Sequence, residues 1–163
     1  HPGVFVRPAH LAIGRARLEG YEAVMLPGVS AEDCLCADLG VDPGFGLQSY
    51  EAHDFFVHGR KIDPSAGLVL WQLAVFGDST FRRLRADPKH LALLAEALME
   101  IYPFDHEVVV YEAATLPVGA ARIQRLPICD LAEALVSQQS TLYVPPVRPP
   151  VAITARLALL NGV

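Results

Sequence analysis

Apolar residues recur along the chain at two different spacings, which predict helices and strands in alternation. The clearest helix lies at 88–101, where Leu91, Leu94 and Leu98 fall on one side. The run 67–73 is apolar throughout except for Gln72 and is typical of a buried central strand. Further strands are expected at 23–26, 47–50, 107–111, 120–126 and 140–144, and further helices at 8–20, 30–40 and 129–136. This alternation predicts an α/β fold, a mixed β-sheet with flanking helices.

The turn before the second helix carries the first candidate chemistry. Pro27-Gly28 breaks an apolar run, and Ser30 then precedes Asp33 by three residues, which is the spacing of a capping box. The free amides of a helix start, together with the Ser30 hydroxyl, can hold a carboxylate or a ribose hydroxyl. A plain capped helix explains the same residues without a ligand, and composition alone favours it.

Gln72 presents a similar choice. An uncharged polar side chain in an apolar strand needs a partner, because a buried unpaired amide costs roughly 1–3 kcal/mol. The Gln72 amide can bond to backbone in the sheet or reach the edge of a base such as adenine at the end of the strand. Tyr111 and Ala113 pose the same alternatives at the end of another strand. Ligands of open α/β sheets collect outside the carboxyl ends of strands.

Composition narrows the class of protein. The 163 residues suit one domain, and 52% hydrophobic residues predict a sizeable core. The net charge of −5 argues against nucleic-acid binding. No apolar run approaches the ~20 residues of a membrane helix, and no secretion signal is visible at the start. We therefore expect a soluble cytoplasmic protein with neither nucleic acid nor membrane as a partner.

Cysteine and histidine give no sign of a metal site. Cys34 and Cys36 are two residues apart in an expected helix, so their side chains point to different faces. Small thiols in a reducing compartment are the favoured interpretation. His53 and His58 lie with Asp54 in an expected connecting stretch, and their spacing matches no recognised ligand set. We expect no bound metal.

Five stretches in order along the chain carry a family resemblance. They read HPGVFVRPAH, EGYEAVMLPGVSAEDCLCADLGVDP, SYEAHDF, LVLWQL and STLYVPP. Together they resemble the tetrapyrrole-methylase superfamily of S-adenosylmethionine-dependent enzymes, and within it most closely the borosin-type α-N-methyltransferases. The resemblance covers the chain to about Pro150. The Pro-rich stretch that begins at Pro145 divides an expected cofactor-binding lobe, 1–144, from a linker and terminal helix, 145–163.

The resemblance implies an activity and a set of contacts. The activity is methylation of backbone amide nitrogens in a precursor peptide, with S-adenosylmethionine as donor and S-adenosylhomocysteine as product. The family also implies a homodimer. By similarity, the residues that contact the donor are His1, Pro2, Gly3, Val4, Ser30, Ala31, Gln72, Tyr111, Ala113 and Thr141.

The same resemblance implies that the chain is the second lobe of a longer enzyme, since it opens inside a turn that follows the first lobe in the family. The residues credited with catalysis belong to that first lobe, so no catalytic residue is assigned and this chain alone is expected to be inactive. Two alternatives remain. One is a tetrapyrrole methyltransferase, which SYEAHDF and the sequence after Gln72 disfavour. The other is a non-catalytic half-domain that needs a partner lobe.

Overall fold

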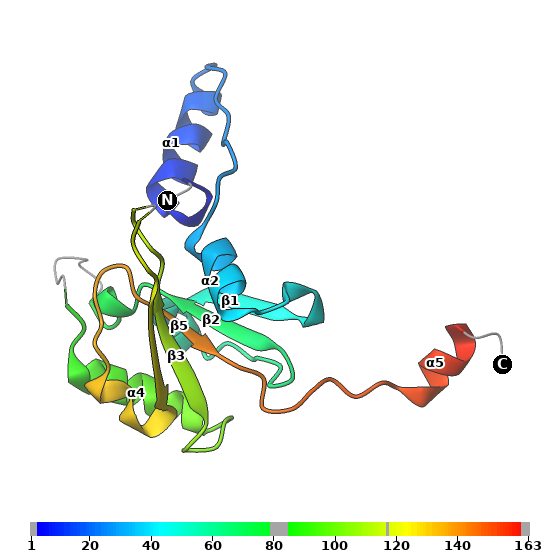
Figure 1. Cartoon of the computed structure of the whole chain (residues 1–163). Helices are drawn as coiled ribbons and strands as arrows, with labels where there is room; N and C mark the ends of the chain where they lie inside the picture. Colours follow the sequence, from blue (N-terminus) through cyan, green and yellow to red (C-terminus); the bar gives the residue numbers. More distant parts are fainter. Residues whose placement is uncertain (1–2, 79–84, 117, 161–163) are drawn as a thin grey trace. The chain divides into compact units, whose positions relative to one another are not determined.

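The computed structural model describes residues 3–78, 85–116 and 118–160. The chain divides into two compact units, His1–Val41 (unit 1) and Asp42–Val163 (unit 2), each of which is described by itself. The expected division into a cofactor-binding lobe, 1–144, and a linker with a terminal helix, 145–163, stays a prediction. Figure 1 labels most of the helices and strands along the chain.

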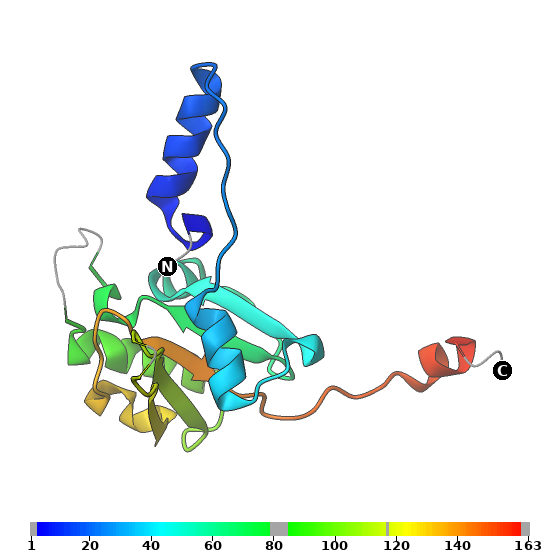
Figure 2. The same cartoon turned by 45° about the horizontal axis from the view of Figure 1, so that its top comes forward.

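Unit 1 contains two α-helices joined by an extended segment. The 3-10 helix η1, Gly3–Phe5, precedes α1, Arg7–Leu18, and α2 spans Ala31–Leu39. The segment between the helices runs back alongside α1 (Figure 2), and Arg17 Nε donates a hydrogen bond to the Ala23 carbonyl over 2.8 Å. The strand expected at 23–26 is wrong, because this backbone is extended without a strand beside it to form a ladder.

Unit 2 is built on a five-stranded mixed sheet with the order β1-β2-β5-β3-β4. Its strands are β1, Leu47–Glu51; β2, Gly67–Trp71; β3, Glu107–Glu112; β4, Arg122–Pro127; and β5, Thr141–Val144. β1 and β2 are parallel, and the other neighbouring pairs are antiparallel. The predicted mixed sheet is confirmed, with strand bounds within two residues of those expected.

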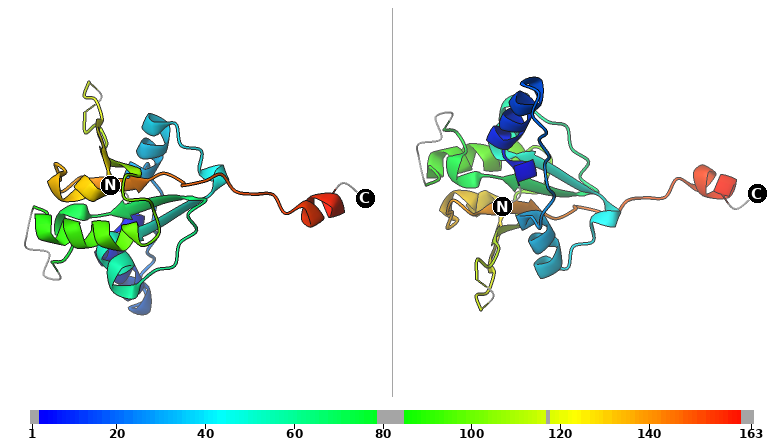
Figure 3. Two further views of the ribbon diagram at one scale, coloured as in Figure 1. Left: turned by 90° about the horizontal axis from the view of Figure 1, so that it is seen from below. Right: turned by 90° about the horizontal axis from the view of Figure 1, so that it is seen from above.

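One face of the sheet carries the main core. Alternation along the strands places Leu68, Val110 and Leu142 on this face, where they are completely buried. Among the helical elements that pack on it are α3, Ala52–His58; α4, Pro88–Met99; and the 3-10 helix η4, Ile128–Glu133. Both views of Figure 3 show α4 beside the η4 segment. Shorter elements complete unit 2: η2, Pro43–Phe45; η3, Leu73–Val75; and α5, Thr154–Leu160.

Two of these helical elements differ from expectation. The stretch that holds His53, Asp54 and His58 is the helix α3, capped at its start by the Glu51 carboxylate and closed by Gly59 in the left-handed region at φ 54°. Glutamate is not a preferred N-cap, so the start of this helix lacks a clear signal. The helix expected at 129–136 is the shorter η4, because Ala134 is already extended at ψ 142°.

Neighbouring leucines of α4 provide a test of the core. Leu94 is fully buried and Leu93 is 45% exposed. Leu94→Ala should lower the free energy of unfolding by about 2–5 kcal/mol through lost burial and a residual cavity. The control Leu93→Ala should change it by less than about 1 kcal/mol, because that side chain keeps much of its contact with water. Denaturant unfolding measures both, and equal losses would contradict the assigned core face.

Candidate functional site

The carboxyl ends of β2 and β3 lie at the same edge of the sheet as the start of β5, because β5 runs antiparallel between them. Four residues implied by the family resemblance follow or occupy these strand ends. Gln72 comes directly after β2, Ala113 directly after β3, and Tyr111 and Thr141 lie within β3 and β5. The fold therefore brings together, from three adjacent strands, residues far apart in sequence. We call this edge the carboxyl edge.

Tyr111 and Thr141 form a direct cross-strand pair. They are register partners in the β3–β5 ladder, and their side chains are 0% and 3% exposed. Their neighbours Val110 and Leu142 point into the main core, so alternation places Tyr111 and Thr141 on the opposite face of the sheet. Side chains of such a pair have Cβ atoms about 4.5–5.5 Å apart. Because both residues are buried, a ligand contact by Tyr111 or Thr141 stays a prediction.

Gln72 adopts a strained backbone conformation. It has φ 62° and ψ 41°, and no other non-glycine residue in the described part of the chain has a positive φ. The left-handed region costs such a residue roughly 1–2 kcal/mol. The expectation that Gln72 lies buried within a strand is wrong, since β2 ends at Trp71 and the Gln72 side chain is exposed. Backbone strain of this kind concentrates at functional sites.

In unit 1, Ser30 begins α2 with the predicted capping box. Its hydroxyl accepts a hydrogen bond from the Asp33 amide at 3.2 Å and donates to Asp33 Oδ2 at 2.7 Å, and its own amide donates to the same oxygen at 2.7 Å. Ala31 is the first residue of the helix, where helix geometry gives its amide no acceptor within the helix. The cap is confirmed, and a ligand contact by Ser30 or Ala31 stays a prediction.

The negative charge at the start of α2 favours some ligand groups over others. The hydrogen bonds from Ser30 hold the pKa of the Asp33 carboxyl below its usual value, so the group is ionised at neutral pH. Glu32 adds a second carboxylate in the first turn. Two negative charges oppose a carboxylate ligand and favour a neutral hydroxyl or a cationic group. Of the two ligand groups anticipated from the sequence, the ribose hydroxyl fits better.

The remaining residues implied by the resemblance lie at the start of unit 1. Gly3 and Val4 belong to η1, and the Val4 carbonyl is 2.7 Å from His10 Nε2. A Cβ on Gly3 would lie 3.1 Å from Met25 Sδ, so a larger residue here requires the Met25 side chain to shift slightly. His1 and Pro2 lie outside the described residues.

An ionic cluster at the carboxyl edge was not anticipated from the sequence. Arg122 Nε and Nη2 donate to the two carboxylate oxygens of Glu112 over 3.0 and 2.5 Å, a bidentate pair across the β3–β4 ladder. The hydroxyls of Ser137 and Ser140 donate to Glu112 Oε1 as well. These four side chains are named the Glu112 cluster. Chiefly through the Arg122 hydrogen bonds, they lower the pKa of Glu112 to about 2.

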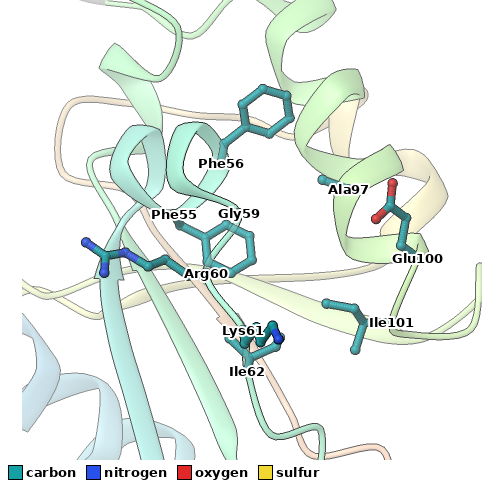
Figure 4. Close-up of a pocket in the computed structure, with 9 residues that line it drawn as sticks. All are labelled: Phe55, Phe56, Gly59, Arg60, Lys61, Ile62, Ala97, Glu100 and Ile101. Atoms are coloured by element: carbon teal, nitrogen blue, oxygen red, sulfur yellow. The ribbon is translucent and has the colours of Figure 1, made fainter.

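A separate cavity lies on the core side of unit 2. It has a volume of about 580 Å³ and lies between α3 with the segment after it and the end of α4 (Figure 4). Phe56, Ile62 and Ile101 supply apolar walls, and Lys61 and Glu100 add charge. None of the eight described residues implied by the family resemblance lines it, so this cavity is not the carboxyl edge.

The described residues form neither a metal-binding cluster nor a helix suited to crossing a membrane. They contain no group of three or more histidine, cysteine, aspartate or glutamate side chains arranged to hold a metal ion. None of the helices in the described ranges combines the length and apolar character that a membrane crossing requires.

Comparison with known proteins identifies the family. The model of the tetrapyrrole (corrin/porphyrin) methylases matches residues 1–132, four-fifths of the chain. The chain therefore belongs to this family. The fold agrees: uroporphyrin-III C-methyl transferase from Thermus thermophilus, solved in complex with S-adenosyl homocysteine, superposes with a TM-score of 0.58 at 14% identity, over 88% of this chain and 62% of that one.

Two fungal relatives are much closer in sequence. One is the methyltransferase/ribosomally synthesized cyclic peptide gymnopeptides precursor of Gymnopus fusipes, 43% identical over 98% of this chain and 40% of that protein. The other is the methyltransferase/ribosomally synthesized type I borosin cyclic peptide precursor of Coprinopsis marcescibilis, 42% identical over 99% of this chain and 43% of that protein. The chain thus spans about two-fifths of the length of these relatives.

The cap of α2 gives a first prediction for the site. Ser30→Ala should lower the free energy of unfolding by about 1 kcal/mol, because it removes the acceptor for the Asp33 amide. Ser30→Thr keeps a hydroxyl at the same place and should retain most of the stability. Denaturant unfolding with amide exchange at Asp33 measures the effect. If exchange at Asp33 is the same in both variants, the cap does not stabilise this helix.

The Glu112 cluster gives a second prediction. Because the folded-state pKa of Glu112, about 2, lies below its ordinary value of 4.5, the stabilisation is complete above pH 4.5 and is lost as pH falls toward 2. Glu112→Gln should therefore flatten the dependence of unfolding free energy on pH within this window. Denaturant titrations at pH 2.5, 3.5, 4.5 and 6, about one unit apart on average, resolve the slope. An unchanged slope would show that Glu112 is not held ionised by its neighbours.

Proposed function

We propose that this chain supplies the donor-binding lobe of an S-adenosylmethionine-dependent methyltransferase that methylates backbone amide nitrogens of a precursor peptide. The gathering of Gln72, Tyr111, Ala113 and Thr141 at the carboxyl edge carries this proposal, since an open α/β sheet binds its ligands at such an edge. The names of the two fungal relatives, which join a methyltransferase to a cyclic peptide precursor, supply the substrate class.

The chain's residues fit the donor in chemical type. The exposed Gln72 amide offers both a donor and an acceptor, which matches the edge of adenine. Tyr111 and Thr141, the buried cross-strand pair of this edge, are proposed to line the adenine. Ser30 and Ala31, in unit 1, are proposed to meet the ribose through the helix start. Gly3 and Val4, with His1 and Pro2, are proposed to meet the methionine part.

The donor supplies an electrophilic methyl group on a sulfonium. The peptide nitrogen takes that methyl group, its N–H proton leaves, and the sulfonium carbon–sulfur bond breaks to give S-adenosylhomocysteine. This lobe contributes by fixing the donor's adenosine, which holds the methyl group in line with the nitrogen and removes rotational freedom before the reaction. No residue of this chain is assigned as the base that receives the proton.

The partner, the assembly, the compartment and the cofactor product belong to the same proposal. The partner is a precursor peptide, and the assembly is a homodimer, for which the exposed leucines of α5 offer apolar surface: Leu157, Leu159 and Leu160 are 52%, 80% and 86% exposed. The compartment is the cytoplasm, which accords with the free thiols of Cys34, Cys36 and Cys129. S-adenosylhomocysteine is the cofactor product, and no metal takes part.

Calorimetric titration of the purified chain with S-adenosylhomocysteine tests the donor site. Gln72→Ala and Gln72→Gly both remove the amide, so both should weaken binding by about tenfold, the equivalent of one or two lost hydrogen bonds. Their stabilities should differ, because glycine tolerates φ 62° and the Gly variant should be more stable than the Ala variant by about 1 kcal/mol. Absence of wild-type binding would contradict the donor site.

The substrate class is tested separately. Expression of the chain together with a precursor peptide, followed by mass spectrometry, should reveal methyl groups on backbone nitrogens when the enzyme is complete. A porphyrin-like absorption band in the purified chain would instead favour the tetrapyrrole alternative. Wild-type donor binding without any methylated peptide would support the non-catalytic half-domain.

A further inference from the structure

The Glu112 cluster lies between the residues proposed to bind adenine. Glu112 is flanked in the chain by Tyr111 and Ala113, and Ser140 immediately precedes Thr141. The cluster therefore joins the end of β3 to the start of β5 at the positions next to the cross-strand pair Tyr111–Thr141. Alternation places the Glu112 side chain on the face opposite that of Tyr111, so the cluster acts on the site through the backbone.

The hydrogen bonds of Ser140 tie the start of β5 in place. Its side chain is buried, and its hydroxyl donates to Glu112 Oε1 over 2.6 Å and accepts from the Ser137 amide over 2.8 Å. Arg122 Nη2 is a further donor to the same hydroxyl at 3.2 Å. The Ser140 amide closes the turn onto the Ser137 carbonyl over 3.1 Å. One carboxylate thus fixes a turn of four residues and the strand that follows it.

The same β3–β4 ladder holds a second pair of the same type for comparison. Glu107 and Arg125 form an ion pair of 2.9 Å near the other end of β3, with side chains 59% and 52% exposed. Exposed pairs of this kind contribute little to stability. The Glu112–Arg122 pair is 14% and 34% exposed, and Arg122 Nη1 is buried without a hydrogen-bond partner among the described residues. A buried donor left unpaired is costly, so the ladder alone does not account for this arrangement.

We propose that Glu112 and Ser140 are positioning residues that set the specificity for adenine, by fixing Tyr111 and Thr141 relative to one another at the carboxyl edge. This inference rests on the proposed donor site. A site distinguishes one base from another only if its hydrogen-bond donors and acceptors are held in a fixed geometry. A hydrogen bond weakens steeply when its donor–hydrogen–acceptor angle departs from linear. Loss of the cluster should therefore loosen base selection more than it weakens binding as a whole.

The test compares two ligands that differ only in the base. S-adenosylhomocysteine and S-inosylhomocysteine carry adenine and hypoxanthine on the same ribose and amino-acid parts. Wild type should prefer the adenine ligand, and Glu112→Gln should lower that preference by about tenfold, the value of one hydrogen bond to a charged group. Ser140→Ala, which leaves the Glu112–Arg122 pair intact, should lower it in the same direction. The matched control Glu107→Gln should leave the preference unchanged.

Amide exchange across residues 137–141 provides a ligand-free measurement. It should accelerate in Glu112→Gln and Ser140→Ala and stay at the wild-type rate in Glu107→Gln. If the cluster variants weaken both ligands by one common factor, or neither ligand, the role is structural and the inference is wrong while the donor site stands. A wild type that binds both ligands equally also overturns the inference. A wild type that binds neither ligand overturns the proposed donor site, and the inference with it.

Discussion

The insertion of β5 between β2 and β3 is the constraint on which the rest of unit 2 depends. β5 has only four residues, all buried, and it is the last strand of the sheet in the chain. Such a short strand needs fixing at both ends. Ser140 is bonded to Glu112 at its start, and the Pro145 carbonyl lies 2.9 Å from His106 Nε2 at its end. Once β5 is in place, Thr141 must lie beside Tyr111, so sheet assembly and assembly of the carboxyl edge are one event.

Local patterns predicted most of the strands and helices, because burial on one face imposes a period that the sequence displays. The helix α4 and the strands β2 and β3 follow this rule. The failures have a common cause. The segment 23–26 is apolar but has no neighbouring strand, and α3 is capped by a glutamate, so each depends on surroundings that no local window contains. Gln72 lies outside β2 because its own left-handed backbone cannot continue the strand.

Only the part of the site formed by residues close together in the sequence could be predicted from the sequence. The capping box of Ser30 and Asp33 spans three residues, and its spacing alone identified it. The pairing of Tyr111 with Thr141 depends on strand order, and Glu112 reaches Arg122 ten residues on and Ser140 twenty-eight residues on. No periodicity relates such positions. The resemblance to a known family supplied Tyr111 and Thr141, but it gave no indication of the cluster that stands next to them.

The two ends of β3 carry glutamate–arginine pairs in different surroundings. At one end an exposed glutamate–arginine pair joins β3 to β4 at little cost in desolvation. At the other end Glu112 and Arg122 are partly buried together with the hydroxyls of Ser137 and Ser140. At the same edge of the sheet, the strained residue Gln72 directly follows β2. The Glu112 cluster stabilises the fold above pH 4.5, whereas the left-handed backbone of Gln72 costs stability. Such costs are retained where a fixed geometry serves a ligand, which is why the proposed donor site and its base specificity are assigned to this edge.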